Sequence, residues 1–248
     1  GIAHFLEHKL FESEDGDAFT KYAATGAYAN AYTSFDRTCY LFSCSDRFYD
    51  NLGILLDFVQ SPYFTAETVQ KEQGIIGQEI RMYDDSPEWR VMFNMLLAMY
   101  KNHPVRIDIA GTVESIAEID DKLLYKCYNT FYNPSNMFIC IAGNVNSEKV
   151  LSQINGAIKT NAPIEIERIG CDEPDEVCES SVEQRLAVAQ PMFCFGYKES
   201  MDKPERTVKE KVRTALLLEI IAGDSSPLYK KLINEGLIND EFSFEYFT

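Results

Sequence analysis

Near the start of the chain, two histidines and a glutamate have the spacing that metal chemistry requires. His4 and His8 are four residues apart, with Glu7 between them in the order His-x-x-Glu-His. On a helix, residues four apart are separated by about one turn and about 6 Å of rise, so both imidazoles lean over one patch of surface. Two imidazoles placed in this way can reach one Zn²⁺ at about 2.0–2.1 Å. We therefore predict that His4 and His8 bind a metal ion.

Glu7 has the position of a catalytic base. It follows His4 by three residues, which keeps its carboxylate near the same helix face without aligning it with both imidazoles. A carboxylate so placed suits a general base acting on a water molecule at the metal. The order is the inverse of His-Glu-x-x-His and is itself a known catalytic motif. The alternative is a pair of surface histidines beside a solvated glutamate.

A catalytic zinc site needs a third protein ligand and an open coordination position. Glu72 and Glu79 are candidates, because they are seven residues apart and therefore share one face of a predicted helix. Ile75 and Ile76 flank that face, so a carboxylate there is partly desolvated and a bound metal would offset the cost of burying its charge. The alternative is that both glutamates are ordinary residues of a helix surface.

Four segments together resemble the pitrilysin/insulinase family of zinc metallopeptidases, which carry this inverted motif. They are the opening GIAHFLEHKLFE, the stretch GAYANAYTSFDRTCY, the stretch EQGIIGQEIRMYDD and the stretch YNPSNMFICIAGNV. The resemblance covers most of the chain. The opening segment is especially similar to bacterial processing-protease-like members.

The resemblance assigns roles residue by residue. It implies that His4, His8 and Glu79 bind Zn²⁺, that Glu7 is the general base, and that Glu72 supports the ligands from outside. It also implies that the chain hydrolyses peptide bonds, with Glu7 taking a proton from water and returning it to the leaving amine. Two imidazoles and a carboxylate also accept Mn²⁺ or Co²⁺, so zinc is inferred from the motif and from metal availability.

A substrate strand is implied by the same resemblance. Ala29, Asn30, Ala31 and Tyr32 match the strand on which family members hold a peptide or protein substrate. An extended peptide would pair with the exposed strand edge through its main chain, so the sequence preference would be broad. The alternative is an ordinary hairpin strand.

Family members consist of two or more similar halves that enclose a chamber. The chain starts at Gly1 without a methionine and resembles one such half, so we expect a piece of a longer protein, truncated at both ends. We expect it to work with a second homologous half or subunit. The alternative function is a non-catalytic homologue that binds peptides or pairs with an active subunit. The presence of His4, Glu7, His8 and Glu79 favours the enzyme.

Helices interspersed with strands are expected to position these residues. Apolar spacing predicts a helix at 2–24 with a break near Gly16, followed by a hairpin of strands at 27–33 and 37–43. Further helices are predicted at 46–59, 65–83, 86–100, 123–132, 148–159, 207–222 and 227–234, and further strands at 137–142, 186–197 and 241–246.

The order of these elements lacks regular βαβ alternation. It favours an α+β fold with a mixed or antiparallel sheet and helices packed on it. We expect residues 1–248 to form a single domain. Its two segments would be joined by an exposed acidic connection at about 164–184, which has eight acidic residues and one arginine.

The amino-acid composition limits the classes of partner that the chain is expected to bind. The net charge of -16 argues against nucleic acid, because binding it relies on basic patches that neutralise phosphate. No apolar run approaches the roughly 20 residues that span a bilayer, so no membrane span is expected. Seven cysteines without a Cys-x-x-Cys pair indicate buried free thiols, although Cys171 and Cys178 flank an acidic segment and could pair. Free thiols indicate a cytoplasmic location.

Overall fold

The computed structural model describes residues 1–159, 162–200 and 206–247. The chain divides into two compact units, Gly1–Tyr197 and Lys198–Thr248. The boundary between them lies after the acidic segment at 164–184, rather than within it. The single domain expected from the sequence stays a prediction.

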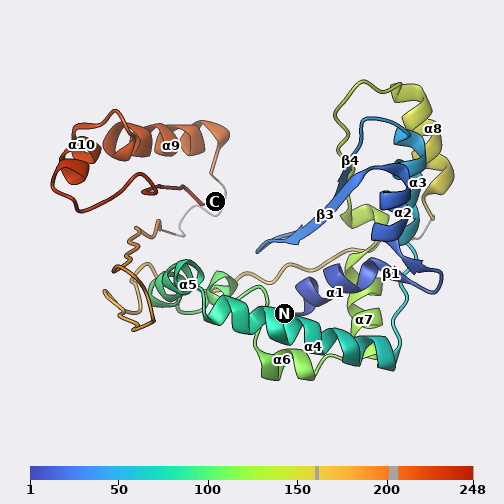
Figure 1. Cartoon of the computed structure of the whole chain (residues 1–248), viewed down its shortest axis with the longest axis horizontal. Coiled ribbons are helices and arrows are strands. Elements are labelled where there is room, and N and C mark those ends of the chain that lie inside the picture. Colours follow the sequence, from blue (N-terminus) through green and yellow to red (C-terminus); the bar gives the residue numbers. More distant parts are fainter. Residues whose placement is uncertain (160–161, 201–205, 248) are drawn as a thin grey trace. The chain divides into compact units, whose positions relative to one another are not determined.

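Helices are the main regular elements of the first unit (Figure 1). The α-helices are α1 (Ile2–Leu10), α2 (Ala18–Thr25), α3 (Phe48–Phe58), α4 (Ala66–Asp84), α5 (Pro87–Met99), α6 (Val113–Ala117), α7 (Asp121–Phe131) and α8 (Ser147–Ala157). Two short 3₁₀ helices are η1 (Pro104–Arg106) and η2 (Pro134–Asn136). The strands are β1 (Glu12–Ser13), β2 (Gly16–Asp17), β3 (Tyr28–Thr33) and β4 (Thr38–Ser43).

The strands form two antiparallel pairs, β1 with β2 and β3 with β4. The α+β class predicted from the sequence is therefore confirmed, with antiparallel pairing. The β3–β4 hairpin also confirms the strands predicted at 27–33 and 37–43. Its side chains alternate, so that Ala29, Ala31 and Thr33 face inward while Asn30 and Tyr32 are exposed.

The predicted break near Gly16 is larger than the sequence indicated. Helix α1 ends at Leu10, and a tight β1–β2 hairpin separates it from α2. Gly16 has a φ of 116°, a conformation that side chains disfavour, and the Asp17 carboxylate accepts from the Phe19 N–H to cap α2. The predicted break is thus confirmed, but the first helix ends earlier than predicted because the β1–β2 turn follows it directly.

One apolar core fixes the elements around the site. Phe5 of α1, Ile76 of α4 and Leu124 of α7 are each 0% exposed and belong to this core. Ala31 of β3 packs against it. Helix α1 therefore contacts α4 and β3 at once, and Figure 1 shows it between them.

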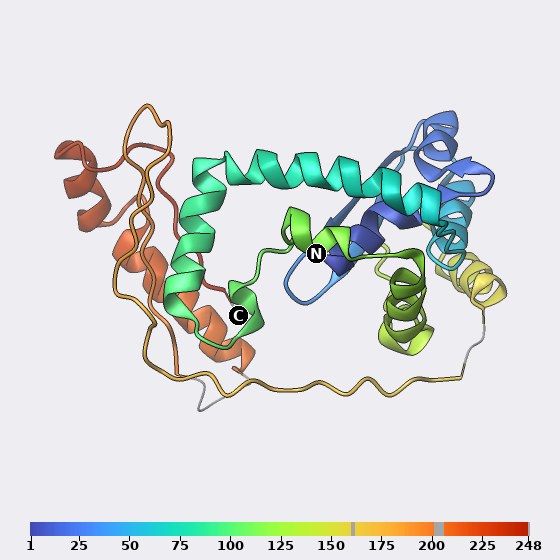
Figure 2. The same cartoon turned by 90° about the horizontal axis from the view of Figure 1, so that it is seen from below.

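Helix α4 begins and ends where the sequence predicts. The Thr65 hydroxyl accepts from the Thr68 N–H and forms a capping box with it. After the helix ends, Ser86 caps α5 by accepting from the Trp89 N–H, and Pro87 occupies the first helical position. Figure 2 shows the result, with α4 as one long helix and α5 turning away from its end.

The acidic segment at 164–184 contacts the loop after α5 through one buried carboxylate. Glu173 is 6% exposed and accepts hydrogen bonds from the main-chain N–H groups of Lys101, Asn102 and His103, at 2.6–2.9 Å. Three N–H donors satisfy a charge that would otherwise be costly to bury. These hydrogen bonds hold the first three residues of the loop that leads to Asp108.

The predicted strands at 137–142, 186–197 and 241–246 are wrong, because these residues form no strand in the structure. The apolar side chains of the first two segments are largely exposed, with Phe138 at 85% and Phe195 at 67%, whereas Phe242 and Phe244 of the third segment are half-buried. A strand exists through hydrogen bonds to a neighbouring strand, and an apolar run does not specify that neighbour. Among the described residues, none pairs with these three segments.

The seven cysteines are free, as expected, and Cys171 does not pair with Cys178. The expectation that they are buried is wrong, since four are half-buried and three are exposed.

Among the described residues, none of the helices combines the length and hydropathy that crossing a bilayer requires. The second unit contains α9 (Val208–Ala222) and α10 (Pro227–Asn234), both as predicted. The Thr207 and Ser226 hydroxyls cap them.

Candidate metal centre

Helix α1 presents His4 and His8 on one side, one turn apart. Their ring centroids are 4.6 Å apart, and the side chains are 11% and 25% exposed. Phe5 and Leu6 lie on other faces of the helix and are buried in the core. Because the apolar residues anchor the helix, the imidazoles are left to face a pocket.

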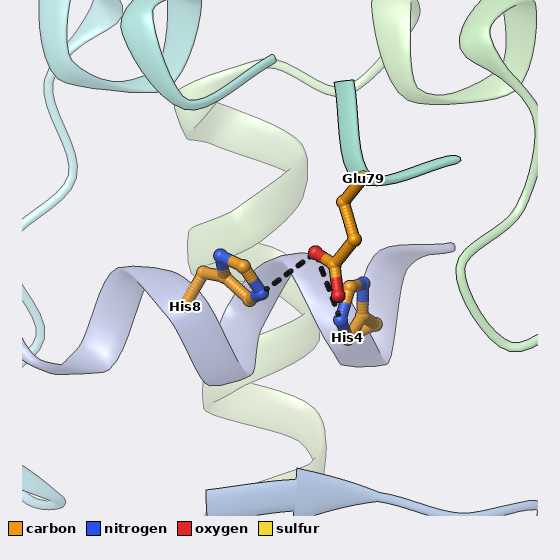
Figure 3. Close-up of side chains that lie close together, drawn as sticks. All are labelled: His4, His8 and Glu79. Atoms are coloured by element: carbon orange, nitrogen blue, oxygen red, sulfur yellow. Dashed lines mark ion pairs between the residues drawn. The ribbon is translucent and has the colours of Figure 1, made fainter. Parts of the chain in front are cut away.

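Glu79 reaches the two imidazoles from α4 (Figure 3). Its Oε2 lies 3.4 Å from Nε2 of His8 and 3.7 Å from Nε2 of His4. In a tetrahedral zinc site with bonds of about 2.1 Å, ligand atoms lie about 3.4 Å apart. The shorter of the two N–O separations equals this edge length and the longer exceeds it by about 0.3 Å, so these three side chains fit a zinc ion after small shifts. They form a group whose ligand atoms all lie within 4.8 Å of one another.

Glu72 contacts the outer side of His8. Nδ1 of His8 donates to Oε1 of Glu72 at 3.0 Å, which leaves Nε2 facing Glu79. Burial lowers the pKa of His8, but the hydrogen bonds with Glu72 and Glu79 outweigh it and raise this pKa to about 9. Without metal, His8 is therefore protonated at neutral pH, and a metal must displace its proton.

The pKa of His4 shifts in the opposite direction to that of His8. Burial lowers its pKa, and the nearby charge of His8 lowers it further. Its Nδ1 is buried without a hydrogen-bond partner among the described residues. His4 therefore stays neutral, which is the protonation state that a metal-binding imidazole needs.

Glu79 is held as a carboxylate. Its interaction with His8 is the main cause that lowers the Glu79 pKa to about 2, against an opposing effect of burial. A hydrogen bond from the Tyr83 hydroxyl to Oε1, at 2.8 Å, lowers the pKa further. An ionised carboxylate is the form that binds a metal cation.

Glu7 lies next to the candidate metal ligands, and its carboxylate is hydrogen-bonded to a residue of β3. The Thr33 hydroxyl donates to Oε2 of Glu7 at 2.5 Å. Burial raises the pKa of Glu7, while this hydrogen bond lowers it. A carboxyl group whose pKa is raised toward neutrality is better suited to exchange protons with water and with a leaving group.

These side chains line a pocket of about 210 Å³. Its lining residues are His4, Glu7, His8, Ala31, Tyr32, Thr33, Glu79, Tyr83, Trp89, Ile109 and Ala110. Two of the four predicted substrate-binding residues, Ala31 and Tyr32, thus lie at the pocket, whereas Ala29 and Asn30 do not line it. Among the described residues β3 pairs with β4 alone, so its other edge has no neighbouring strand.

Several residues of the pocket were missed in the sequence. Thr33 continues the inward face of Ala29 and Ala31, so the alternation of the strand could have identified it. Tyr83 is one helical turn after Glu79, a spacing at which side chains meet. Trp89 and Ile109 carry no local signal that links them to the histidines.

The chain matches the models of two known domain families. Residues 1–113 match the model of the insulinase family, peptidase family M16, and residues 118–247 match the model described as the peptidase M16 inactive domain. All four residues of the predicted zinc and base set fall within the first match.

Similar proteins carry zinc-protease names. A Bacillus subtilis protein named uncharacterized zinc protease YmfH is 50% identical, over 99% of this chain and 59% of its own length. A solved structure, titled as a putative M16-like peptidase from Alicyclobacillus acidocaldarius, has a TM-score of 0.88 and 41% identity. It covers 98% of this chain and 58% of its own. The chain thus spans about three fifths of the length of these two relatives.

Proposed function

The chain belongs to the insulinase family of peptidases, family M16, and we propose that it is the metal-binding part of a zinc-dependent endopeptidase. His4, His8 and Glu79 would hold the ion, and Glu7 would act as the general base. One observation carries the proposal above all: two imidazole nitrogens and one carboxylate oxygen from separate helices converge at the spacing of zinc ligands.

The chemistry proposed for the site divides between the ion and the side chains. Bound Zn²⁺ would act as a Lewis acid that polarises water and the peptide carbonyl. Glu7 accepts a proton from the attacking water and returns it to the leaving amine. Thr33 orients the Glu7 carboxylate through its hydroxyl, and Glu72 fixes the ring of His8 through Nδ1.

The proposed substrate is an extended stretch of peptide or protein that adds to the free edge of β3. Support comes from the position of this strand, since Ala31, Tyr32 and Thr33 line the pocket that holds the histidines. Main-chain pairing along the edge would bring a peptide bond to the metal while reading few side chains. The sequence preference would therefore be broad.

A non-catalytic role is the second candidate, and the match of residues 118–247 to the inactive-domain model favours it. In this role the chain would bind peptides or pair with an active subunit. The zinc and base residues lie outside that match, which favours the enzyme.

Two measurements distinguish the enzymatic role from the non-catalytic role: the zinc content and the peptide-cleaving activity of the protein. Both are made on the protein purified from the organism that produces it. The enzyme predicts about one zinc per chain and cleavage that Glu7→Gln abolishes while the zinc remains. Glu14→Gln, at an exposed position of the same region, is the matched control and should cleave normally. Bound zinc with cleavage unchanged in Glu7→Gln would remove the proposed base, and absence of cleavage in the unmodified protein would favour the second role.

The partners and location are also proposals. A second homologous half or subunit is supported by the length of the relatives, of which this chain spans about three fifths. A cytoplasmic location is supported by seven unpaired cysteines, and cell fractionation would test it.

A further inference from the structure

The two carboxylate oxygens of Glu79 have different partners. Oε2 faces both imidazoles, at 3.4 and 3.7 Å. Oε1 accepts a hydrogen bond from the Tyr83 hydroxyl at 2.8 Å. Tyr83 follows Glu79 by one turn of α4, so a single helix supplies both the carboxylate and the hydroxyl that holds it.

Tyr83 is in turn held by residues from other parts of the chain. Its ring stacks on Trp89 of α5, with centroids 4.3 Å apart and planes 16° from parallel. The Trp89 Nε1–H donates to Oδ2 of Asp108 at 2.7 Å. Oδ1 of Asp108 accepts from the Ala110 N–H at 3.0 Å, which fixes the loop. The series Asp108, Trp89, Tyr83 and Glu79 thus runs from the loop to the metal site.

This arrangement bears on how Glu79 would bind a metal. A carboxylate with both oxygens free can bind a metal through one oxygen or two. A catalytic zinc keeps three protein ligands and leaves a further position open for water or substrate. A second oxygen from Glu79 would crowd that position. A hydroxyl that occupies Oε1 prevents this and leaves Oε2 alone to face the ion.

We propose that Tyr83 is a positioning residue that holds Glu79 as a single-oxygen ligand, and that Trp89 and Asp108 hold Tyr83 in place. This inference rests on the proposed function, because it requires a metal bound by His4, His8 and Glu79. The hydroxyl that carries the effect is peripheral to the apolar core, since Tyr83 is only half-buried. Its removal should therefore change the metal site more than the stability of the fold.

The test compares Tyr83→Phe with unmodified protein by metal binding rather than by activity. Loss of a hydrogen bond to a metal ligand typically weakens metal affinity about 10- to 100-fold. We expect the zinc dissociation constant of Tyr83→Phe, measured by competition with a chelator, to rise by about 10-fold. In the cobalt-substituted protein, we expect weaker visible absorption, because a second oxygen of Glu79 raises the coordination number.

Tyr128→Phe is the matched control. The Tyr128 hydroxyl donates to the main-chain oxygen of Val59 at 2.8 Å within the core, away from the pocket. Its removal should lower the melting temperature while leaving zinc affinity and the cobalt spectrum unchanged. Trp89→Leu removes the stacking partner but keeps the Tyr83 hydroxyl, and it should weaken zinc binding in the same direction as Tyr83→Phe.

Two different failures can be distinguished. If zinc binds the unmodified protein and His8→Ala abolishes binding, the metal site stands. If Tyr83→Phe then matches the unmodified protein in both zinc affinity and cobalt spectrum, the role of Tyr83 is overturned. If zinc does not bind the unmodified protein, or binds His8→Ala equally well, the proposed metal site fails, and the role of Tyr83 fails with it.

Discussion

The Thr33 hydroxyl at the end of β3 donates a hydrogen bond of 2.5 Å to the Glu7 carboxylate on α1. This bond joins the strand proposed to hold the substrate to the side chain proposed to move the proton. Thr33 also faces the pocket, so the bond lies at the point where a bound peptide would meet the base.

Replacing Thr33 with valine keeps the shape of the side chain and removes this bond. Glu7 then loses the donor that orients it and lowers its pKa. We expect kcat to fall by about 10-fold, a fraction of the roughly 10²–10⁴-fold contribution of general-base catalysis. The acidic limb of the pH–rate profile should move to higher pH, because the pKa of Glu7 rises. Zinc content should not change, and a loss of zinc in Thr33→Val would assign Thr33 to the metal site instead.

Replacing Glu72 with glutamine should weaken zinc binding. Glu72 accepts from Nδ1 of His8, and glutamine keeps an oxygen that can accept but removes the negative charge that makes this hydrogen bond strong. The expected increase in the zinc dissociation constant is about 10- to 100-fold. Competition with a chelator measures it. Glu67→Gln, in the exposed first turn of the same helix, serves as the control, and equal effects of the two changes would contradict a specific role for Glu72.

The stability of the metal-free protein should depend on pH because of the interaction between His8 and Glu79. The pKa of His8 is raised from 6.5 to about 9, so its contribution to stability is complete below pH 6.5 and is lost as the pH rises toward 9. The pKa of Glu79 is lowered from 4.5 to about 2, so its contribution is present above pH 4.5 and is lost as the pH falls toward 2. The joint contribution is therefore greatest between pH 4.5 and 6.5.

Urea unfolding of the metal-free protein at pH 5.5 and pH 9 measures this effect. The free energy of unfolding should fall between the two pH values by more in the unmodified protein than in His8→Gln. Equal decreases in the two proteins would show that His8 does not carry the effect.

Removing the metal should lower the stability of the protein. A ligand that binds the folded state alone stabilises it by about 2.7 kcal/mol at a concentration 100 times its dissociation constant. We expect chelation to lower the Tm and added zinc to restore it. His8→Ala should melt at the same temperature with and without zinc, and a zinc-dependent Tm in this variant would place the ion elsewhere.

The local part of the site follows from helix geometry and could be predicted from the residues alone. His4 and His8 share a helix, and their separation is set by the geometry of one turn, which does not depend on the rest of the fold. The start of α4 at Thr65 and of α5 at Ser86 were predictable for the same reason, since a cap acts within three or four residues.

The contacts between residues distant in the sequence depend on how the helices pack. Spacing alone placed Glu72 and Glu79 on one helix face, and the resemblance to a family was needed to assign them different roles. The packing of α4 against α1 brings Glu79 between the imidazoles and Glu72 behind His8. Their roles stay predictions until metal binding is measured.

The same distinction explains what the sequence missed and what it mispredicted. Trp89 and Asp108 reach the site through a turn and a loop whose paths depend on the whole core, so no short-range pattern could connect them to Glu79. The strand predicted at 137–142 failed because pairing needs a neighbour that an apolar run does not name. Side-chain periodicity is a local property of the chain, whereas the meeting of α1, α4 and β3 depends on the apolar core that all three share.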